Sequence, residues 1–328
     1  MHIARFASAF VAGAVVLSGA LAAVSGAVAA DLPSRKAPLL AAPEPTLDIH
    51  GFADFTIAST RVTPGGLLIY PSNGALMQTQ TGLSFDIYKN KGAFINSFTV
   101  FGGVWSESWT APPVGTRHWQ EFDWWAGASV GFADYWKLSA QILQFKFPGG
   151  PTDENFVFSL SYDDSHFGWP ITINPYVNLF YNNSGPSTVV FGKNGGTYRF
   201  EVGMVPTLDL KKTTGVPLSL SAPTWITFGP TDYWNREDAT TRRCGPLGTS
   251  ACATSSAGVI STGLQAKYSL EQIIPKRLGN WYVKGGVQYY HIMNDALRAA
   301  QVATGAAPNF AASKTDAFVF STGIGVSF

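Results

Sequence analysis

The side chains best suited to chemistry are the two cysteines and the four histidines that follow residue 30. Cys244 and Cys252 lie in the segment CGPLGTSAC, and two cysteines this close in a Gly/Pro-rich loop of an exported chain typically form a disulfide. A metal site would need further ligands, and the histidines are scattered along the chain at His50, His118, His166 and His291. The pattern predicts a disulfide between Cys244 and Cys252, no metal site and no cofactor.

A membrane-embedded lipase with a β-barrel architecture uses a histidine and a serine two residues apart on the outer face of one strand, so that the base reaches the nucleophile. The residues at that spacing are Phe52, Gln120, Gly168 and Met293. Ser165 adjoins His166, but adjacent side chains point apart. A protease could pair His50 with Asp48 or Asp54, which leaves an enzymatic alternative open, although the sequence predicts no enzyme.

Residues 1–30 have the organisation of a secretory signal peptide. Arg5 precedes a long apolar run, and AVAA at positions 27–30 supplies the small residues that signal peptidase needs. The run is long enough for a membrane anchor, but the small residues and the Asp31 that follows favour cleavage. Residues 31–46, with four prolines, predict an extended periplasmic leader ahead of a single domain at 47–328.

The composition is poor in charge and rich in aromatic residues. Charged residues make up 13% of the chain and aromatic residues 14%, whereas ordinary soluble domains hold roughly 25% charged residues. The 22 basic and 21 acidic residues nearly balance, which argues against nucleic acid as a partner. After residue 30 no stretch offers the roughly 20 apolar residues of a spanning helix, so a membrane could be crossed only by a closed β-barrel.

Segments of roughly ten residues that alternate apolar with small or polar residues follow one another along the chain, as in transmembrane barrels. Their even number suits a closed antiparallel transmembrane β-barrel of about 12 strands. Tryptophans and tyrosines near the segment ends fit interfacial girdles, although an ordinary soluble β core is the alternative. The segments are 47–60, 80–88, 93–105, 118–130, 135–147, 154–163, 169–182, 196–206, 217–229, 258–270, 280–292 and 316–328.

The connections alternate in length, as expected for short periplasmic turns and long extracellular loops. The connections after even-numbered segments are no longer than about ten residues. Five of the six after odd-numbered segments are longer, and 148–153 is the exception. The last long loop contains NDALRAAQVA at 294–303, a helix-like stretch that could plug the lumen or cap the surface.

The alternation assigns one face of each strand to the lumen. Charge rings tune which solutes pass a pore, and mixed charges can also neutralise one another, so no strong ion selectivity is expected. The residues expected to narrow the pore are the inward charged residues together with Phe101, Trp125 and Tyr176. The charged residues expected to point inward are Asp48, Asp54, Asp86, Glu121, Asp123, Asp163, Glu201, Lys137, Lys146, Arg199, Lys267 and Lys284.

Three stretches resemble outer-membrane β-barrel proteins of alphaproteobacteria. ADLPSRKAP at 30–38 resembles their mature start, and PKRLGNWYVKGGVQYYH at 275–291 is similar to the last turn and following strand of their uncharacterised porins. Phe328 matches the terminal residue that the barrel-assembly machinery favours. The resemblance implies a barrel in the outer membrane, surrounded by lipid and lipopolysaccharide, whose C-terminal strand meets that machinery, and it transfers no functional residue.

The sequence therefore predicts a Gram-negative outer-membrane porin-like channel for passive diffusion of small hydrophilic solutes. A barrel of this strand number is narrower than a sixteen-stranded porin and should be partly filled by inward side chains. The alternative is a closed barrel that serves as a surface anchor, adhesin or envelope-structural protein through its long loops. The last segment, 316–328, should pair with the first and close the barrel.

Overall fold

The computed structural model describes residues 48–60, 62, 74–111, 118–150, 152–187, 193–234, 256–303 and 307–328. The expected signal peptide (1–30), the leader (31–46) and both cysteines lie outside these residues. Among the described residues, no helix is long and apolar enough to cross a membrane.

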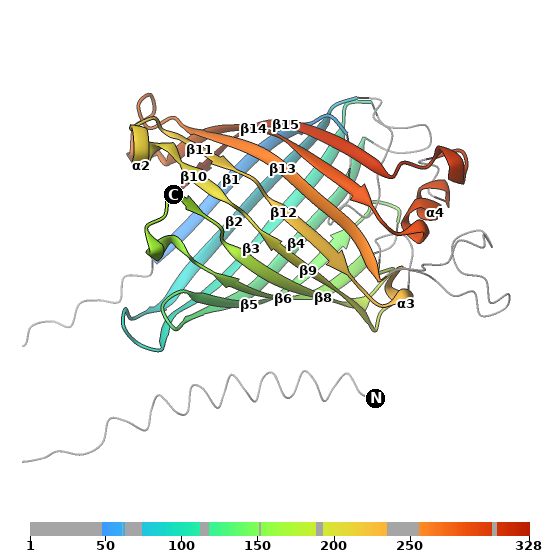
Figure 1. Cartoon of the computed structure of the whole chain (residues 1–328), viewed down its shortest axis with the longest axis horizontal. Coiled ribbons are helices and arrows are strands. Elements are labelled where there is room, and N and C mark those ends of the chain that lie inside the picture. Colours follow the sequence, from blue (N-terminus) through green and yellow to red (C-terminus); the bar gives the residue numbers. More distant parts are fainter. Residues whose placement is uncertain are drawn as a thin grey trace, which may run out of the picture. The chain divides into compact units, whose positions relative to one another are not determined.

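Twelve of the fifteen described strands form one closed antiparallel ring (Figure 1), because β12 pairs with β13 as well as with β9. The predicted fold class, an all-β closed antiparallel barrel, is confirmed. The strands of the ring are β1 (Asp48–Ala58), β2 (Leu76–Lys89), β3 (Ile95–Trp109), β4 (Trp119–Phe132), β5 (Trp136–Lys146), β6 (Thr152–Tyr162), β8 (Pro175–Ser184), β9 (Thr197–Met204), β12 (Thr224–Phe228), β13 (Ala257–Ser269), β14 (Asn280–Ile292) and β15 (Asp316–Ser327).

Two of the predicted strands are broken into two pieces, and a third is followed by a short separate strand. The short strands β7 (Ile171–Thr172), β10 (Thr207–Asp209) and β11 (Leu218–Ser221) pair with one another in the order β11-β10-β7 and join the ring through β13. The breaks fall at Asn174, which has a positive φ of 50°, and at Pro206 and Pro223. Proline cannot donate a ladder hydrogen bond, so continuous strands over 169–182 and 217–229 were wrong predictions, whereas β9 confirms a single strand over 196–206.

The two ends of the barrel differ. The loop end, where β1 finishes, carries α3 (Thr231–Trp234) and α4 (Asp295–Ala303), whereas the turn end carries α2 (Leu210–Thr214) and the C-terminus. Three 3-10 turns complete the described elements: η2 (Ser165–Phe167), η4 (Lys276–Leu278) and η5 (Phe310–Ala312). The short connection expected between the segments 196–206 and 217–229 thus contains the helix α2, and the helix-like stretch of the last loop is α4.

The last strand closes the ring as predicted. β15 pairs with β1 over seven residue pairs, from Phe52 opposite Ser327 to Ala58 opposite Ser321. Phe328 extends the pairing, since its N–H donates to the Gly51 carbonyl at 3.0 Å and its carbonyl accepts from the Gly51 N–H at 2.9 Å. Its ring lies against Gly51, where a Cβ would come within 2.4 Å of it. Closure pairs β1 and β15 on both sides, so neither strand presents the amides of a free edge to hydrocarbon.

The outer face of the ring is apolar along its whole circumference. Alternate residues point outward and expose large apolar side chains, including Leu138, Leu160, Val202, Leu264 and Phe318. Phe158 and Val177 confirm the faces predicted for their strands, since both side chains are exposed on that outer side. The residues between them, which face the lumen, are mainly small, polar or charged, with aromatic side chains such as Trp105 and Tyr176 among them.

The loop end contains the larger of two apolar clusters among the described residues. We call it the cap: Tyr233 and Trp234 of α3 and Ala296 and Leu297 of α4 pack with Val259, Ile292 and Ala317 of the barrel strands. Leu297 and Val259 are fully buried. A buried apolar cluster of this kind holds α3 and α4 against the barrel rather than leaving them in solvent.

Candidate functional site: the lumen

The centre of the lumen is organised around Asp54 of β1. Its Oδ1 accepts from Lys284 Nζ at 2.6 Å, and its Oδ2 accepts from the Tyr282 hydroxyl at 2.9 Å. Thr56 Oγ1 also donates to Oδ1 at 2.8 Å. Lys267 lies over the Tyr282 ring at 3.8 Å from its centroid. Three predicted inward residues, Asp54, Lys267 and Lys284, therefore meet around one carboxylate.

The hydrogen bond between Asp54 of β1 and Tyr282 of β14 passes over β15, whose residue between them is a glycine. Gly325 of β15 lies opposite Asp54 on one side and Tyr282 on the other. A Cβ on Gly325 would approach the Tyr282 hydroxyl to 2.4 Å and Asp54 Oδ2 to 2.9 Å. The glycine is what allows side chains of β1 and β14 to bond across β15.

A second charged pair lies on β9. Arg199 and Glu201 are two residues apart on the lumenal side, with Arg199 Nη1 at 3.5 Å from Glu201 Oε2. The guanidinium stacks on the Phe180 ring at 3.8 Å, and Asn178 donates to Glu201 Oε1 at 3.1 Å. Arg199 is almost fully buried, so this pair fills the lumen beside the β8 wall rather than lining open water.

The predicted acids of β4 are also buried. Glu121 lies opposite Glu107 of β3, and both side chains are buried, as is Asp123. Gln78 donates to Glu107 Oε2 at 3.1 Å, and the backbone N–H of Lys146 donates to Asp123 Oδ1 at 3.2 Å. These acids belong to a packed polar layer towards the loop end.

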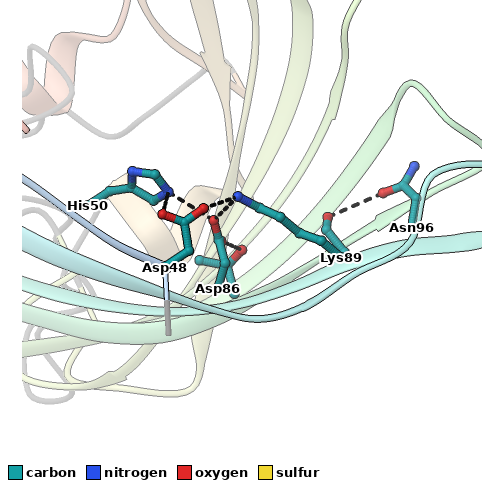
Figure 2. A network of polar contacts seen from close by, with 7 residues as sticks. Asp48, His50, Asp86, Lys89 and Asn96 are labelled. Atoms are coloured by element: carbon teal, nitrogen blue, oxygen red, sulfur yellow. Dashed lines mark hydrogen bonds and ion pairs between the residues drawn. The ribbon is translucent and has the colours of Figure 1, made fainter. Parts of the chain in front are cut away.

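The turn end carries a compact charge network, shown in Figure 2. His50 Nε2 lies 3.0 Å from Asp86 Oδ2 and 3.4 Å from Asp48 Oδ1, and Lys89 Nζ lies 2.6 Å from Asp48 and 2.7 Å from Asp86. Thr99 donates to the other Asp86 oxygen at 2.6 Å. The Lys89 ammonium lies between the two carboxylates, where a bound cation would have to displace it. The network ties the start of β1 to the end of β2.

The remaining predicted residues are dispersed. Lys137 lies with Asp163 and Tyr176 on a cavity of about 480 Å³ near the turn end. The Trp125 ring packs on Gly103 and the Tyr176 ring on Gly203, so both rings lie along the wall, and Phe101 shares the lumenal face of β3. Lys146 is a correction: the lumenal residues of β5 are odd-numbered, which puts Lys146 on the outer face.

A cavity of about 350 Å³ lies beside Asp54 and Lys284, and we call it the chamber. Its wall includes side chains that the sequence did not assign to the lumen, because glutamine carries no motif there and because Trp105 and Trp225 were expected in the interfacial girdles, a prediction that their place on the chamber corrects. These are Gln78, Gln80, Gln265, Gln288, Trp105, Trp225 and Tyr290. One feature of the sequence could have identified these residues: each occupies a lumenal position in the alternating pattern of its strand.

The histidines are held by acids or by backbone carbonyls. His50 contacts Asp86, and His291 Nδ1 contacts Asp316 at 2.8 Å. His118 and His166 bond the carbonyls of Trp109 and Asp163 at 2.9 and 3.0 Å. Of the two acids considered for His50, Asp48 is nearby, while Asp54 is bonded to Lys284.

The closed antiparallel ring, the apolar outer face and the polar lumen define the class: this is a β-barrel of the outer-membrane type. No protein-family model and no curated protein matches the sequence. Among solved structures, the chain is similar to the COG4313 outer membrane channel from Pseudomonas putida F1, with 10% identity over 85% of this chain and 95% of that one and a TM-score of 0.45.

Two further solved structures show the same general likeness. Pseudomonas putida OprB matches with 9% identity over 86% of this chain and 94% of that one, at a TM-score of 0.39. The transport unit of the autotransporter AIDA-I from Escherichia coli matches with 12% identity over 87% and 92%, at a TM-score of 0.35. At these identities the likeness concerns fold alone.

Proposed function

We propose that this protein is an outer-membrane channel for passive diffusion of small hydrophilic solutes. The observation that supports it best is the polar lumen, in which Asp54, Lys284 and four glutamines border a chamber of about 350 Å³. A barrel wall that served only as an anchor would not need an unfilled polar chamber at its centre. The lumenal charges are mixed in sign and paired, so the proposed pore favours neither cations nor anions strongly.

The proposal includes the cellular setting that the sequence predicts. Residues 1–30 direct export and are removed, the barrel lies in outer-membrane lipid and lipopolysaccharide, and the strand ending at Phe328 meets the barrel-assembly machinery. The relationship to alphaproteobacterial porins is part of the same proposal. The protein has no assigned catalytic role in it.

The cap favours a second candidate function. Leu297, Tyr233 and Trp234 are buried where solute would enter, as in a closed barrel that acts as a surface anchor or adhesin through its loops. The two functions differ in whether the cap moves aside under working conditions.

Planar-bilayer recordings of the purified full-length protein test the proposal. A channel gives discrete, reproducible conductance steps in potassium chloride. Consistently silent insertions, with correct insertion checked by protease resistance of the barrel, would contradict the channel and favour the anchor.

A further inference from the structure

The chamber differs chemically from the rest of the lumen, where charges of both signs are mixed. Among the chamber residues of the described chain, Asp54 and Lys284 are the charged ones, and they neutralise each other through their 2.6 Å contact. A solute in the chamber therefore meets no net charge. Charged solutes would gain little there and would lose hydration on entering.

Two tryptophans face the chamber from opposite walls. Trp105 is on β3 and Trp225 on β12, and these strands are six places apart in either direction around the ring of twelve. Tyr290 meets Trp225 edge-on, with ring centroids 6.0 Å apart and planes at 66°. Such rings present electron-rich faces, which attract the weakly positive C–H groups on the face of a sugar ring.

The glutamines supply the matching polar groups. An amide offers two donor hydrogens and one acceptor oxygen, and a sugar hydroxyl likewise donates and accepts. The side chains of Gln80 and Gln265 make no hydrogen bond within the described part of the chain and line the chamber. Gln78 and Gln288 are held in place through Glu107 and Ser261, at 3.1 and 2.7 Å.

We propose that the chamber is a binding site for neutral sugars on the permeation path, with Trp105 and Trp225 as stacking platforms and Gln80 and Gln265 as hydroxyl ligands. The inference rests on the proposed channel function and names its solute class. The chamber volume of about 350 Å³ lies within the range of small-molecule sites, roughly 300 to 1,000 Å³.

The test combines two measurements on the purified full-length protein with maltose as probe. In planar bilayers, maltose should reduce the ion current in a saturable way, whereas arginine at equal concentration should not. In detergent, maltose should change the intrinsic tryptophan fluorescence with the same dissociation constant. Trp105→Ala and Trp225→Ala should each weaken binding by about fivefold or more, the expected loss for one stacking contact.

Trp124→Ala provides a matched control, because Trp124 lies on the outward face of β4 with its Nε1 bonded to Gln144. It should bind maltose as the parent protein does. Trp105→Phe should retain more affinity than Trp105→Ala, which separates stacking from a general packing defect.

The outcomes separate the site from the channel. Conductance steps that are insensitive to maltose, together with unchanged fluorescence, would overturn the sugar site and leave the channel intact. Saturable maltose binding in a protein that inserts silently would support the site and overturn the channel. Equal block by arginine and maltose would also overturn the sugar assignment.

Discussion

Asp54 and Lys284 form an ion pair of 2.6 Å although a whole strand lies between them. The pair bridges β1 and β14 over the glycine-bearing face of β15, so it fastens the closing strand from the inside of the barrel. Its side chains are mostly shielded from solvent, and removing one partner would leave the other charge uncompensated. The pair thus couples barrel closure to the charge of the chamber.

Neutralising Asp54 should change the ion selectivity of the pore. In Asp54→Asn, Lys284 faces the chamber without its counter-charge, so the reversal potential across a tenfold potassium chloride gradient should move towards anion preference. Lys284→Gln should move it towards cations. The double variant should return close to the parent value, and equal shifts in one direction for both single variants would contradict the role of the pair.

Adding one methyl group to the closing strand should weaken the barrel. In Gly325→Ala, the Cβ would lie 2.4 Å from the Tyr282 hydroxyl, so the Asp54 contacts must shift, at a cost of about 1 to 3 kcal/mol. Gly285→Ala is the control, since the atom nearest to its Cβ would be the Ser321 carbonyl oxygen at 3.4 Å. Urea unfolding in detergent, followed by tryptophan fluorescence, should show a lower midpoint for the first variant alone.

The twelve strands could be predicted because a period of two residues survives in every one of them. Where the strand prediction failed, a local signal was present in the sequence: Pro175 and Pro223 lie within the two segments that turned out to be broken. The sequence did not predict the short helix α2, which Asp209 caps by accepting from the Lys211 N–H at 3.0 Å.

The residues of the candidate site likewise include some that the sequence predicted and some that it could not predict. The alternation of side chains along each strand correctly assigned Asp54, Lys267 and Lys284 to the lumenal face. Lys146 was assigned wrongly, because it lies on the opposite face of β5 from Lys137. The meeting of Asp54 with Tyr282 depends on strand register around the whole ring, which no single segment encodes. For the same reason, Trp105 and Trp225 could not be recognised as neighbours of one chamber.

Weakening the cap should increase conduction through the proposed channel. Leu297→Ala removes a fully buried side chain, and such changes cost about 2 to 5 kcal/mol in a packed core. Single-channel recordings should then show more frequent or larger openings. Asp295→Asn is the control, because Asp295 is exposed at the start of α4 and pairs with Arg298 at 3.0 Å. A destabilised cap with unchanged conduction would place the solute path elsewhere.

The predicted disulfide can be tested directly on the purified chain. If Cys244 and Cys252 are bonded, a maleimide should label neither cysteine in denaturant until a reductant is added, after which it should label both. The Cys244→Ser variant should expose one reactive thiol without reductant. Two labelled cysteines in the unreduced parent protein would contradict the disulfide.

A contact between two turns should give the turn end a measurable pH response. The Lys211 ammonium of α2 donates to the Glu271 carboxylate between β13 and β14, with Lys276 Nζ at 3.4 Å from its other oxygen. The Lys211 hydrogen bond lowers the pKa of Glu271 below its ordinary value of 4.5. Because the folded pKa is depressed, the contact stabilises the fold above about pH 4.5 and is lost as the pH falls through the folded value.

NMR titration of the Glu271 carboxyl in detergent micelles should therefore give a midpoint below 4.5. Lys211→Met should raise that midpoint, because the Lys211 hydrogen bond that lowers the pKa of Glu271 most is removed while Lys276 remains. High salt should raise it as well, since both partners are near the surface and their attraction is screened. An unshifted midpoint in the parent protein, or no response to Lys211→Met, would show that the two turns are not joined through this pair.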